Sequence, residues 1–354
     1  MAASPDLPVV LYHYLTSPFA KRVVWYLTLR KIPYSECIQP RIMPRPDLVL
    51  LGVSYRRIPV LSIGRDVYVD SRLIFRKLEA LYPPSAAHPG ISAAHAAAGT
   101  PEQVALERLL GARATDPAFF RAFVQCMPAR VFADPAFLRD RAAMNGIDLD
   151  QATAGASPFA AEALDRARPE VLGFARRWVR ELEEGLLADG RPWILDSNNG
   201  NNGGPSLADI ETAWLLHWIT GAGALPPDVL GAESTPRVFA WLARFREAVD
   251  AAAQPATRSL AGAEAARLIA GSPFAEPEGG ILREDPVVGA KGLAKGVDVR
   301  VWPTDYGFTH KDVGRLVAID DEESVIEAQG EFGSVRIHAP RHGFTIARED
   351  ESAL

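Results

Sequence analysis

The spacing of apolar residues changes twice along the chain, and this change restricts the fold more than any other feature. Over the first 82 residues, signals for strands and helices follow one another in the order β-α-β and then β-β-α. From about residue 101 to 270 the apolar residues recur at helical spacing, and from residue 297 they alternate at every second position. A chain of 354 residues is also too long for one typical core. We therefore expect three domains, over residues 1–83, 100–272 and 290–354.

Two segments rich in proline and glycine mark the boundaries, at residues 83–99 and 271–296. After the second boundary, five short strand-like segments are separated by turns. This pattern is typical of a small β-barrel or sandwich of about sixty residues. We therefore expect an all-β, barrel-like extension at the C-terminal end.

The side chains of this extension indicate packing rather than chemistry. Its aromatic residues either form an exposed patch for a partner or pack onto the rest of the protein, and we favour packing. These aromatic residues are Trp302, Tyr306 and Phe308. Its histidines have no metal-ligand spacing, so we expect structural or surface roles for them. The histidines are His310, His338 and His342.

Composition and charge indicate a soluble protein of a reducing compartment. The formal net charge of −6 argues against a general binder of nucleic acid or of anionic membranes. No run approaches the roughly 18 apolar residues that a membrane-spanning helix needs, and the N-terminus lacks the pattern of a signal peptide. The two cysteines, Cys37 and Cys126, offer neither metal-ligand spacing nor a disulfide framework. We therefore expect a cytoplasmic protein without a bound metal.

A strand-like run ends and a helical run begins within the segment Thr16-Ser17-Pro18. Proline is favoured at the first position of a helix and serine at the position before it, so Ser17 could serve only as an N-cap. The same position can also hold an anion, because the free N–H groups and the helix dipole converge there. Both interpretations stay open at this point.

A thiolate is the anion that makes the second interpretation chemically useful. A free thiol has a pKa of about 8.5, and lowering that value by about two units requires roughly 2.7 kcal/mol. One hydrogen bond to a charged group contributes about 1.5–3 kcal/mol, and the helix end adds up to about 1 kcal/mol. Ser17 could therefore activate a bound thiol without a general base.

Two further motifs also permit both a structural and a binding interpretation. In "RRIPVL", residues 56–61, Pro59 opens a strand. A cis Ile58–Pro59 bond would turn the backbone of Ile58 outward to pair with an extended peptide, although a trans bond is the commoner case. Asp70 and Ser71 precede a helical run and could simply cap it, or could hold the two charges of an amino-acid zwitterion.

Together these motifs resemble the N-terminal domain of glutathione S-transferases. The resemblance is carried by "LYHYLTSPFAKRV", "RRIPVL" and "VYVDSRLI", and "SLADIETAW" resembles the N-cap signature of the family's helical domain. The motifs occur in the family's order within residues 7–270, and the chain looks like a tau- or omega-like, fungal-type member with a C-terminal extension. The resemblance implies a thioredoxin-like α/β domain followed by an all-α domain, usually in a homodimer, and a role in detoxification or secondary metabolism.

The resemblance implies a role for each motif residue. Ser17 matches the residue that donates a hydrogen bond to the sulfur of glutathione. Pro59 matches a cis proline, and Ile58 matches the residue whose backbone pairs with the cysteinyl unit. Asp70 and Ser71 match the pair that holds the γ-glutamyl end.

Other glutathione contacts are less clearly defined by the resemblance. The glycyl carboxylate is expected to meet a basic residue, for which Arg45 and Arg57 are favoured over Arg41 and Arg56. Tyr14 lies where several classes place a catalytic tyrosine, and it is an alternative to Ser17. Because the chain has serine where omega members have cysteine, a mixed disulfide with the protein is not expected at that position.

The second substrate of such proteins lies between the first helix and the helical domain. Aromatic and basic side chains are the candidates for this site, although each could equally belong to the core or to a solvated face. The candidates are Phe19, Arg113, Phe120 and Phe123. Asp209, in "SLADIETAW", is expected to be a buried helix cap rather than a chemical group.

Two functions compete on this evidence. The first is a glutathione transferase that forms the thiolate beside Ser17 and transfers it to a small hydrophobic electrophile, or uses it for isomerisation or cleavage. The second is a non-catalytic glutathione-binding or regulatory protein that keeps the fold without turnover. Retention of Ser17, Ile58-Pro59 and Asp70-Ser71 together favours the enzyme.

Overall fold

The computed structural model describes residues 7–95, 99–148, 159–195, 203–252 and 258–350. The N-terminal domain begins with the strand β1 (Val9–His13) and the helix α1 (Pro18–Leu29), which starts at the Ser17-Pro18 pair. The elements that follow are β2 (Ser35–Ile38), α2 (Pro46–Val49), β3 (Val60–Ile63), β4 (Asp66–Val69) and α3 (Ser71–Leu81). Strand β1 pairs in parallel with β2 and antiparallel with β3, and β4 continues the sheet.

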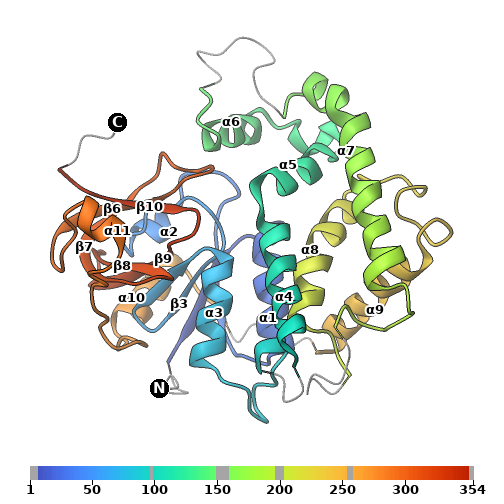
Figure 1. Cartoon of the computed structure of the whole chain (residues 1–354). Coiled ribbons are helices and arrows are strands. Elements are labelled where there is room, and N and C mark those ends of the chain that lie inside the picture. Colours follow the sequence, from blue (N-terminus) through green and yellow to red (C-terminus); the bar gives the residue numbers. More distant parts are fainter. Residues whose placement is uncertain (1–6, 96–98, 149–158, 196–202, 253–257, 351–354) are drawn as a thin grey trace.

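The helical domain follows as expected and packs against α1 (Figure 1). Its helices are α4 (Pro101–Thr115), α5 (Pro117–Gln125), α6 (Pro135–Met144), α7 (Ala161–Glu181), α8 (Leu207–Gly221) and α9 (Pro236–Ala252). Short 3₁₀ turns cover Ala93–His95 and Ala129–Phe132, and a π-helical turn at Leu182–Leu186 continues α7. None of the helices in the described part of the chain is both long and apolar enough to cross a bilayer.

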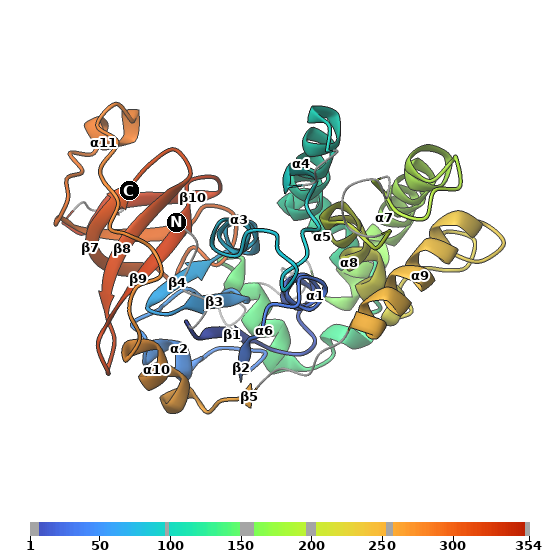
Figure 2. The same cartoon turned by 90° about the horizontal axis from the view of Figure 1, so that it is seen from below.

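The β extension continues the N-terminal sheet instead of standing apart from it. Its strands are β6 (Asp298–Pro303), β7 (Asp312–Ile319), β8 (Glu323–Gln329), β9 (Ser334–Pro340) and β10 (Phe344–Arg348). Strand β9 pairs in parallel with β4, so that one sheet of ten strands runs in the order β10-β6-β7-β8-β9-β4-β3-β1-β2-β5 (Figure 2). The expected α/β, all-α and all-β regions are confirmed, and the shared sheet is the feature that the sequence pattern did not predict.

Residues between the helical domain and the extension also join the N-terminal domain. The strand β5 (Arg258–Ser259) pairs with β2, and the helix α10 (Gly262–Ala270) packs against α2. A further short helix, α11 (Pro286–Ala290), precedes the extension. One face of the N-terminal strands therefore packs against α1, α3 and the helical domain, and the other shares a core with α2, α10 and side chains of the extension.

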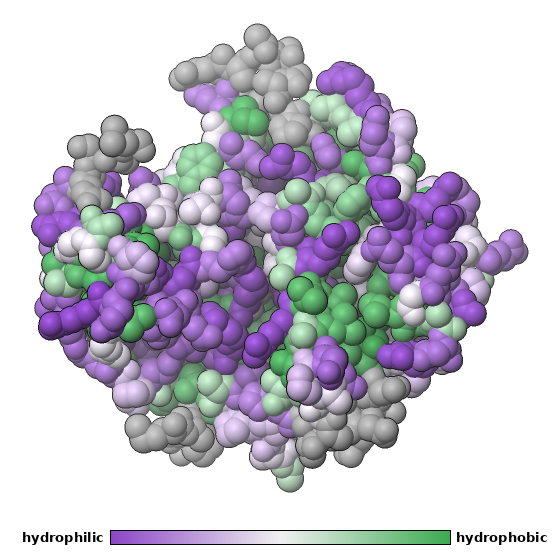
Figure 3. All heavy atoms as spheres, viewed as in Figure 1, coloured by the Kyte–Doolittle hydropathy of each residue, from purple (hydrophilic) through white to green (hydrophobic). Residues whose placement is uncertain are grey.

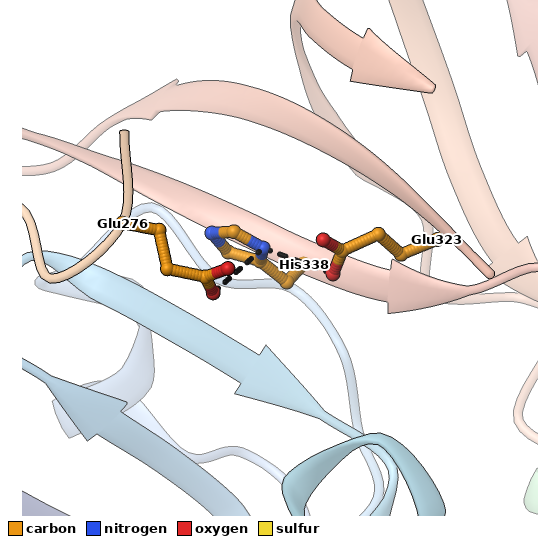
Figure 4. Close-up of side chains that lie close together, drawn as sticks. All are labelled: Glu276, Glu323 and His338. Atoms are coloured by element: carbon orange, nitrogen blue, oxygen red, sulfur yellow. Dashed lines mark hydrogen bonds and ion pairs between the residues drawn. The ribbon is translucent and has the colours of Figure 1, made fainter. Parts of the chain in front are cut away.

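A charge cluster with a buried centre holds the extension against the N-terminal domain, and Figure 4 shows Glu276, Glu323 and His338 of this cluster. On β9, the Nε2 atom of His338 lies 3.0 Å from Oδ1 of Asp66, and Nδ1 lies 3.1 Å from Oε2 of Glu323. Lys77 of α3 donates to Glu276 over 2.7 Å and to Glu323 over 2.6 Å. These five residues, here called the His338 cluster, link α3, β4, β8 and β9. His338 thus has one of the structural roles expected for the histidines of the extension.

The two hydrogen bonds require His338 to be an imidazolium, since a neutral imidazole has only one N–H donor. Burial opposes the charge, but hydrogen bonds to Asp66 and Glu323 outweigh burial and raise the pKa of His338 to about 9. One histidine nitrogen and two glutamate oxygens of this cluster lie within 4.8 Å of one another, as metal ligands would. The Lys77 ammonium already bridges the two glutamates, so cations of the protein itself balance these carboxylates.

Protonation of His338 predicts a stability change at alkaline pH. Below the unfolded pKa of about 6.5 the histidine carries its proton in both states, so its stabilising contribution is complete. As the pH rises to about 9, the unfolded chain loses the proton first, and a contribution of about 3 kcal/mol is lost. Urea unfolding should show a larger fall in midpoint between pH 6.5 and 9.5 for wild type than for His338→Gln. Parallel pH profiles of the two proteins would contradict the prediction.

Asp209 is the buried cap that the sequence predicts, and it connects three segments of the helical domain. The side chains of Ser206 and Asp209 form a capping box at the start of α8. The Asp209 carboxylate also accepts from the Ile194 backbone N–H and from Trp241 Nε1, each over 2.8 Å. Because the side chain is fully buried, its removal leaves several donors without an acceptor.

Replacement of Asp209 should therefore lower stability without a specific effect on the cleft described below. We expect Asp209→Ala to lower the free energy of unfolding by about 3 kcal/mol, and Asp209→Asn, which keeps one acceptor oxygen, to lower it less. Thermal unfolding followed by circular dichroism measures both changes. If Asp209→Ala leaves the free energy of unfolding unchanged, the buried hydrogen bonds of Asp209 do not stabilise the helical domain.

Candidate functional site

A cleft of about 1160 Å³ lies where the N-terminal domain, the helical domain and the extension meet. Its walls come from the start of α1, the segment before β3, the start of α3, the helices α4 to α6 and α8, and three turns of the extension. On the face seen in Figure 3, a patch of hydrophobic residues is exposed over the helical domain, with hydrophilic residues around it and over much of the rest of the face. The residues that line the cleft include charged side chains, such as Arg57 and Asp70, and aromatic rings, such as Phe19 and Phe120.

Ser17 lies at the helix start that faces the cleft. It is the N-cap of α1, its side chain is buried, and its Oγ atom accepts from the Ala20 N–H over 3.2 Å. No acceptor for the Ser17 hydroxyl proton is found among the described residues. The cap bond therefore uses only an oxygen lone pair and leaves the O–H free to donate to a ligand.

The two tyrosines at the end of β1 lie in different environments. Tyr12 is fully buried, and burial raises the pKa of its hydroxyl far above the ordinary value. Tyr14 lines the cleft, where its hydroxyl accepts from Arg141 of α6 over 3.5 Å and its ring lies 5.8 Å from the Arg45 guanidinium. Tyr14 therefore faces the basic end of the cleft.

The segment before β3 presents its backbone to the cleft. The Ile58–Pro59 bond is cis, and both residues line the cleft. No described residue hydrogen-bonds the backbone N–H or C=O of Ile58. A second cis bond, Met43–Pro44, was not predicted from the sequence.

Asp70 and Ser71 start α3 beside these residues. Asp70 has a φ of 70°, which is rare for a residue with a side chain, and its carboxylate accepts three bonds of 2.9 Å from the backbone and guanidinium of Arg72. Burial opposes the charge of Asp70, but Arg72 outweighs it and lowers the pKa of this carboxyl. The Ser71 hydroxyl accepts from Arg22 over 3.2 Å, and Arg22 is ion-paired with Glu211 of α8.

Arg57 contacts the extension across the cleft. Its guanidinium is ion-paired with Asp305, its Nε donates to the Tyr306 carbonyl over 2.9 Å, and it stacks 3.8 Å from the Tyr306 ring. Sequence reasoning did not identify Arg72, Asp305 or Tyr306 as residues of this site. Arg72 directly follows the Asp70-Ser71 motif, whereas no local signal points to Asp305 or Tyr306, because Arg57 and Asp305 are 248 residues apart in the chain.

Arg45 is buried and holds the loop before β3 together. Its guanidinium donates to the carbonyls of Pro40, Arg41 and Arg56, and burial lowers the pKa of Arg45 to about 10. Arg56 is ion-paired with Asp140 of α6 over 2.9 Å. Together with Arg141, the arginines of this loop make one end of the cleft strongly basic. The basic lining residues there are Arg41, Arg45, Arg56 and Arg141.

The apolar wall contains two of the four residues expected at the second substrate site. Phe19 and Phe120 line the cleft with ring centroids 4.8 Å apart, and Phe120 stacks on Trp218. Phe123 is fully buried in the core of the helical domain, and Arg113 stacks on Phe119 and Trp178. Neither Phe123 nor Arg113 is among the described residues that line the cleft, because these side chains pack toward α7.

Among the aromatic residues of the extension, Tyr306 packs as favoured, whereas Phe308 packs on one side only and stays 36% exposed. Tyr306 packs on Arg57 of the N-terminal domain. Phe308 packs against Gly146 at the end of α6, where a Cβ atom would lie 2.7 Å from its ring. Trp302 instead makes a cation–π contact, in which the Lys311 ammonium lies 4.2 Å from the centroid of its ring.

Comparisons with known proteins agree with this architecture. Residues 11–86 match the family model of the glutathione S-transferase N-terminal domain, and residues 122–254 match that of a domain of unknown function. A glutathione S-transferase-like protein from Pseudomonas syringae has 23% sequence identity over 97% of this chain and 99% of its own, with a TM-score of 0.62. A glutathione S-transferase from Rhodospirillum rubrum has 20% identity over 76% of this chain and 96% of its own, with a TM-score of 0.44.

A maleylacetoacetate isomerase from Anaeromyxobacter dehalogenans has 20% identity over 77% of this chain and 95% of its own, with a TM-score of 0.41. No curated protein matches the chain. At 23% identity, the likeness to the Pseudomonas syringae protein supports the fold alone. Residues 11–86 therefore match the glutathione S-transferase N-terminal domain, and the chain as a whole shares the fold of the Pseudomonas syringae protein.

Proposed function

We propose that the protein is a glutathione transferase that binds glutathione in the cleft and stabilises its thiolate with the Ser17 hydroxyl and the start of α1. The observation that carries the proposal is the buried Ser17 hydroxyl, whose proton is free to donate into the cleft. One hydrogen bond to the thiolate contributes about 1.5–3 kcal/mol, enough to lower its pKa by one to two units. The neighbouring helix N-terminus stabilises the same negative charge.

The proposed position of the peptide follows from groups that the protein leaves unpaired. The free backbone N–H and C=O of Ile58 can pair with the cysteinyl unit, as an added strand would. Asp70 and Ser71, at the start of α3, then lie toward the γ-glutamyl end. The glycyl carboxylate lies toward the basic end that Arg41, Arg45 and Arg56 form. Arg57 is not assigned to the glycyl carboxylate, because its positive charge helps to lower the pKa of Asp70 at the other end of the peptide.

The second substrate is proposed to bind against the apolar wall. Phe19 and Phe120 offer ring surfaces on the same cleft as Ser17, and Trp218 extends this surface. A small hydrophobic electrophile fits this surface, since burial of apolar area is the main favourable term there. The homodimer, the cytoplasmic location and the role in detoxification or secondary metabolism remain predictions from sequence.

The alternative is a protein that binds glutathione without turnover. One feature of the extension favours this alternative. Asp305 and Tyr306 already bind the Arg57 guanidinium inside the cleft, so this group is less able to bind a ligand. Both functions predict glutathione binding, and only the enzyme predicts consumption of an electrophile. A turnover assay with a panel of small aromatic electrophiles therefore distinguishes the two functions.

The role of Ser17 is tested by the thiol pKa of bound glutathione. Thiolate absorbance in the far ultraviolet should titrate about two units below free glutathione in wild type, and about one to two units higher in Ser17→Ala than in wild type. Ser17→Thr keeps a hydroxyl for both cap and ligand and should retain the lowered pKa. Tyr14→Phe is the matched control and should also retain it.

Different outcomes separate the roles of these residues. If the thiol pKa of bound glutathione stays low in Ser17→Ala and rises in Tyr14→Phe, then Tyr14 rather than Ser17 stabilises the thiolate. If Ser17→Ala lowers only thermal stability, by about the 1 kcal/mol of a lost cap, Ser17 is structural. If wild type binds no glutathione, the proposed function is wrong.

A further inference from the structure

The turn between β6 and β7 places three polar side chains of the extension in the cleft. This turn, residues 304–307, is here called the 304–307 loop, and Thr304, Asp305 and Tyr306 all line the cleft. The loop lies near the start of α3, because both contact the β9–β10 turn: Thr304 donates to the Gly343 carbonyl over 2.9 Å and Arg72 to the His342 carbonyl over 3.3 Å. The extension therefore contributes side chains to the very end of the cleft that is proposed to receive the γ-glutamyl unit.

The 304–307 loop is held from three directions. Arg57 binds it by an ion pair to Asp305 and by hydrogen bonds to the Tyr306 carbonyl. The Thr304 N–H donates to the Gly343 carbonyl over 2.9 Å, and the Gly307 N–H donates to the Met144 carbonyl of α6 over 2.6 Å. These bonds join the N-terminal domain, the β9–β10 turn and the helical domain, so the loop presents its side chains in a defined place.

Four charges alternate at this end of the cleft. The carboxylates of Asp70 and Asp305 are paired with the guanidinium groups of Arg72 and Arg57, respectively. The four formal charges sum to zero. An α-amino acid group is also neutral overall, since it carries one ammonium and one carboxylate. A neutral group of alternating charges suits such a zwitterion better than a simple anion, because each end of the ligand meets an opposite charge.

The two carboxylates differ in what they can still accept. Both oxygens of Asp70 already accept from Arg72, through three bonds of 2.9 Å. Asp305 uses Oδ1 for Arg57, and no partner of Oδ2 is found in the described part of the chain. The Asp305 side chain is 24% exposed, so this oxygen remains accessible from the cleft. An ammonium group has three donors to place, and Asp305 offers the more open acceptor.

We propose that Asp305 of the extension binds the α-ammonium of the γ-glutamyl unit, together with Asp70, and thereby selects γ-glutamyl peptides that have a free α-amino group. Ser71 and Arg72 face the α-carboxylate of the same unit. This inference rests on the proposed function, because it assumes that glutathione occupies the cleft. It assigns the extension a part in ligand recognition, supplied by the same chain that carries Ser17.

The test compares glutathione with glutaryl-cysteinyl-glycine, which is glutathione without its α-amino group. Isothermal titration measures the affinity of both peptides for wild type and for Asp305→Asn. Wild type should prefer glutathione by about tenfold or more, since a hydrogen-bonded charge pair is lost with the analogue. Asp305→Asn should bind glutathione about tenfold more weakly than wild type and should bind the analogue with little change.

Two further variants control for indirect effects. Asp321→Asn removes another aspartate of the extension that lines the cleft and has no ion pair within the described residues, so both affinities should stay unchanged. Asp305→Glu keeps a carboxylate and should recover part of the preference for glutathione. If Asp305→Asn weakens both peptides equally, Asp305 only positions the loop, and the inference is wrong.

The remaining outcomes also decide the question. Tighter glutathione binding by Asp305→Asn would mean that Asp305 competes with the ligand for Arg57, which overturns the inference. An unchanged preference in Asp305→Asn would overturn it as well, while leaving the role of Ser17 intact. Absence of glutathione binding by wild type would overturn the proposed function itself, and this inference with it.

Discussion

The parallel pairing of β9 with β4 determines where the extension lies, and most features of the cleft depend on it. In a four-stranded sheet, β4 would leave a row of backbone N–H and C=O groups unpaired at its edge. Strand β9 pairs with these groups through Asp66, Val67 and Tyr68. The register is fixed at the side chains too, since Asp66 and His338 come from adjacent strands and share a buried hydrogen bond. A slip by one residue would move His338 to the other face of the sheet.

This pairing brings two turns of the extension to the start of α3. The 304–307 loop reaches Arg57, and the carbonyl of His342 in the β9–β10 turn accepts from Arg72 over 3.3 Å. The cleft therefore has a wall that neither the α/β domain nor the helical domain provides alone. The His338 cluster joins the extension to β4 through buried Asp66, Glu323 and His338, so its charges help to hold this wall in place.

Three helix caps in this protein show that the same local motif can have a structural role or a binding role. The Asp209 carboxylate accepts four hydrogen bonds within the helical domain, so its capacity is used inside the core. Asp70 accepts three bonds from Arg72 and retains little capacity for a ligand. Ser17 accepts only one bond and keeps its proton. The hydrogen bonds that remain to be made, rather than the cap motif, distinguish a structural cap from a binding site.

The sequence alone determined the features that depend on near neighbours. Strands and helices, the Ser17-Pro18 helix start and the Ser206–Asp209 capping box follow from local spacing and capping, which act over a few residues. Only the tertiary structure decided that β9 joins β4, that Arg57 pairs with Asp305, and that Phe120 lines the cleft while Phe123 lies in the core. These outcomes depend on contacts between residues that are distant in the chain, or on which face of a helix meets another element, and no local pattern specifies them.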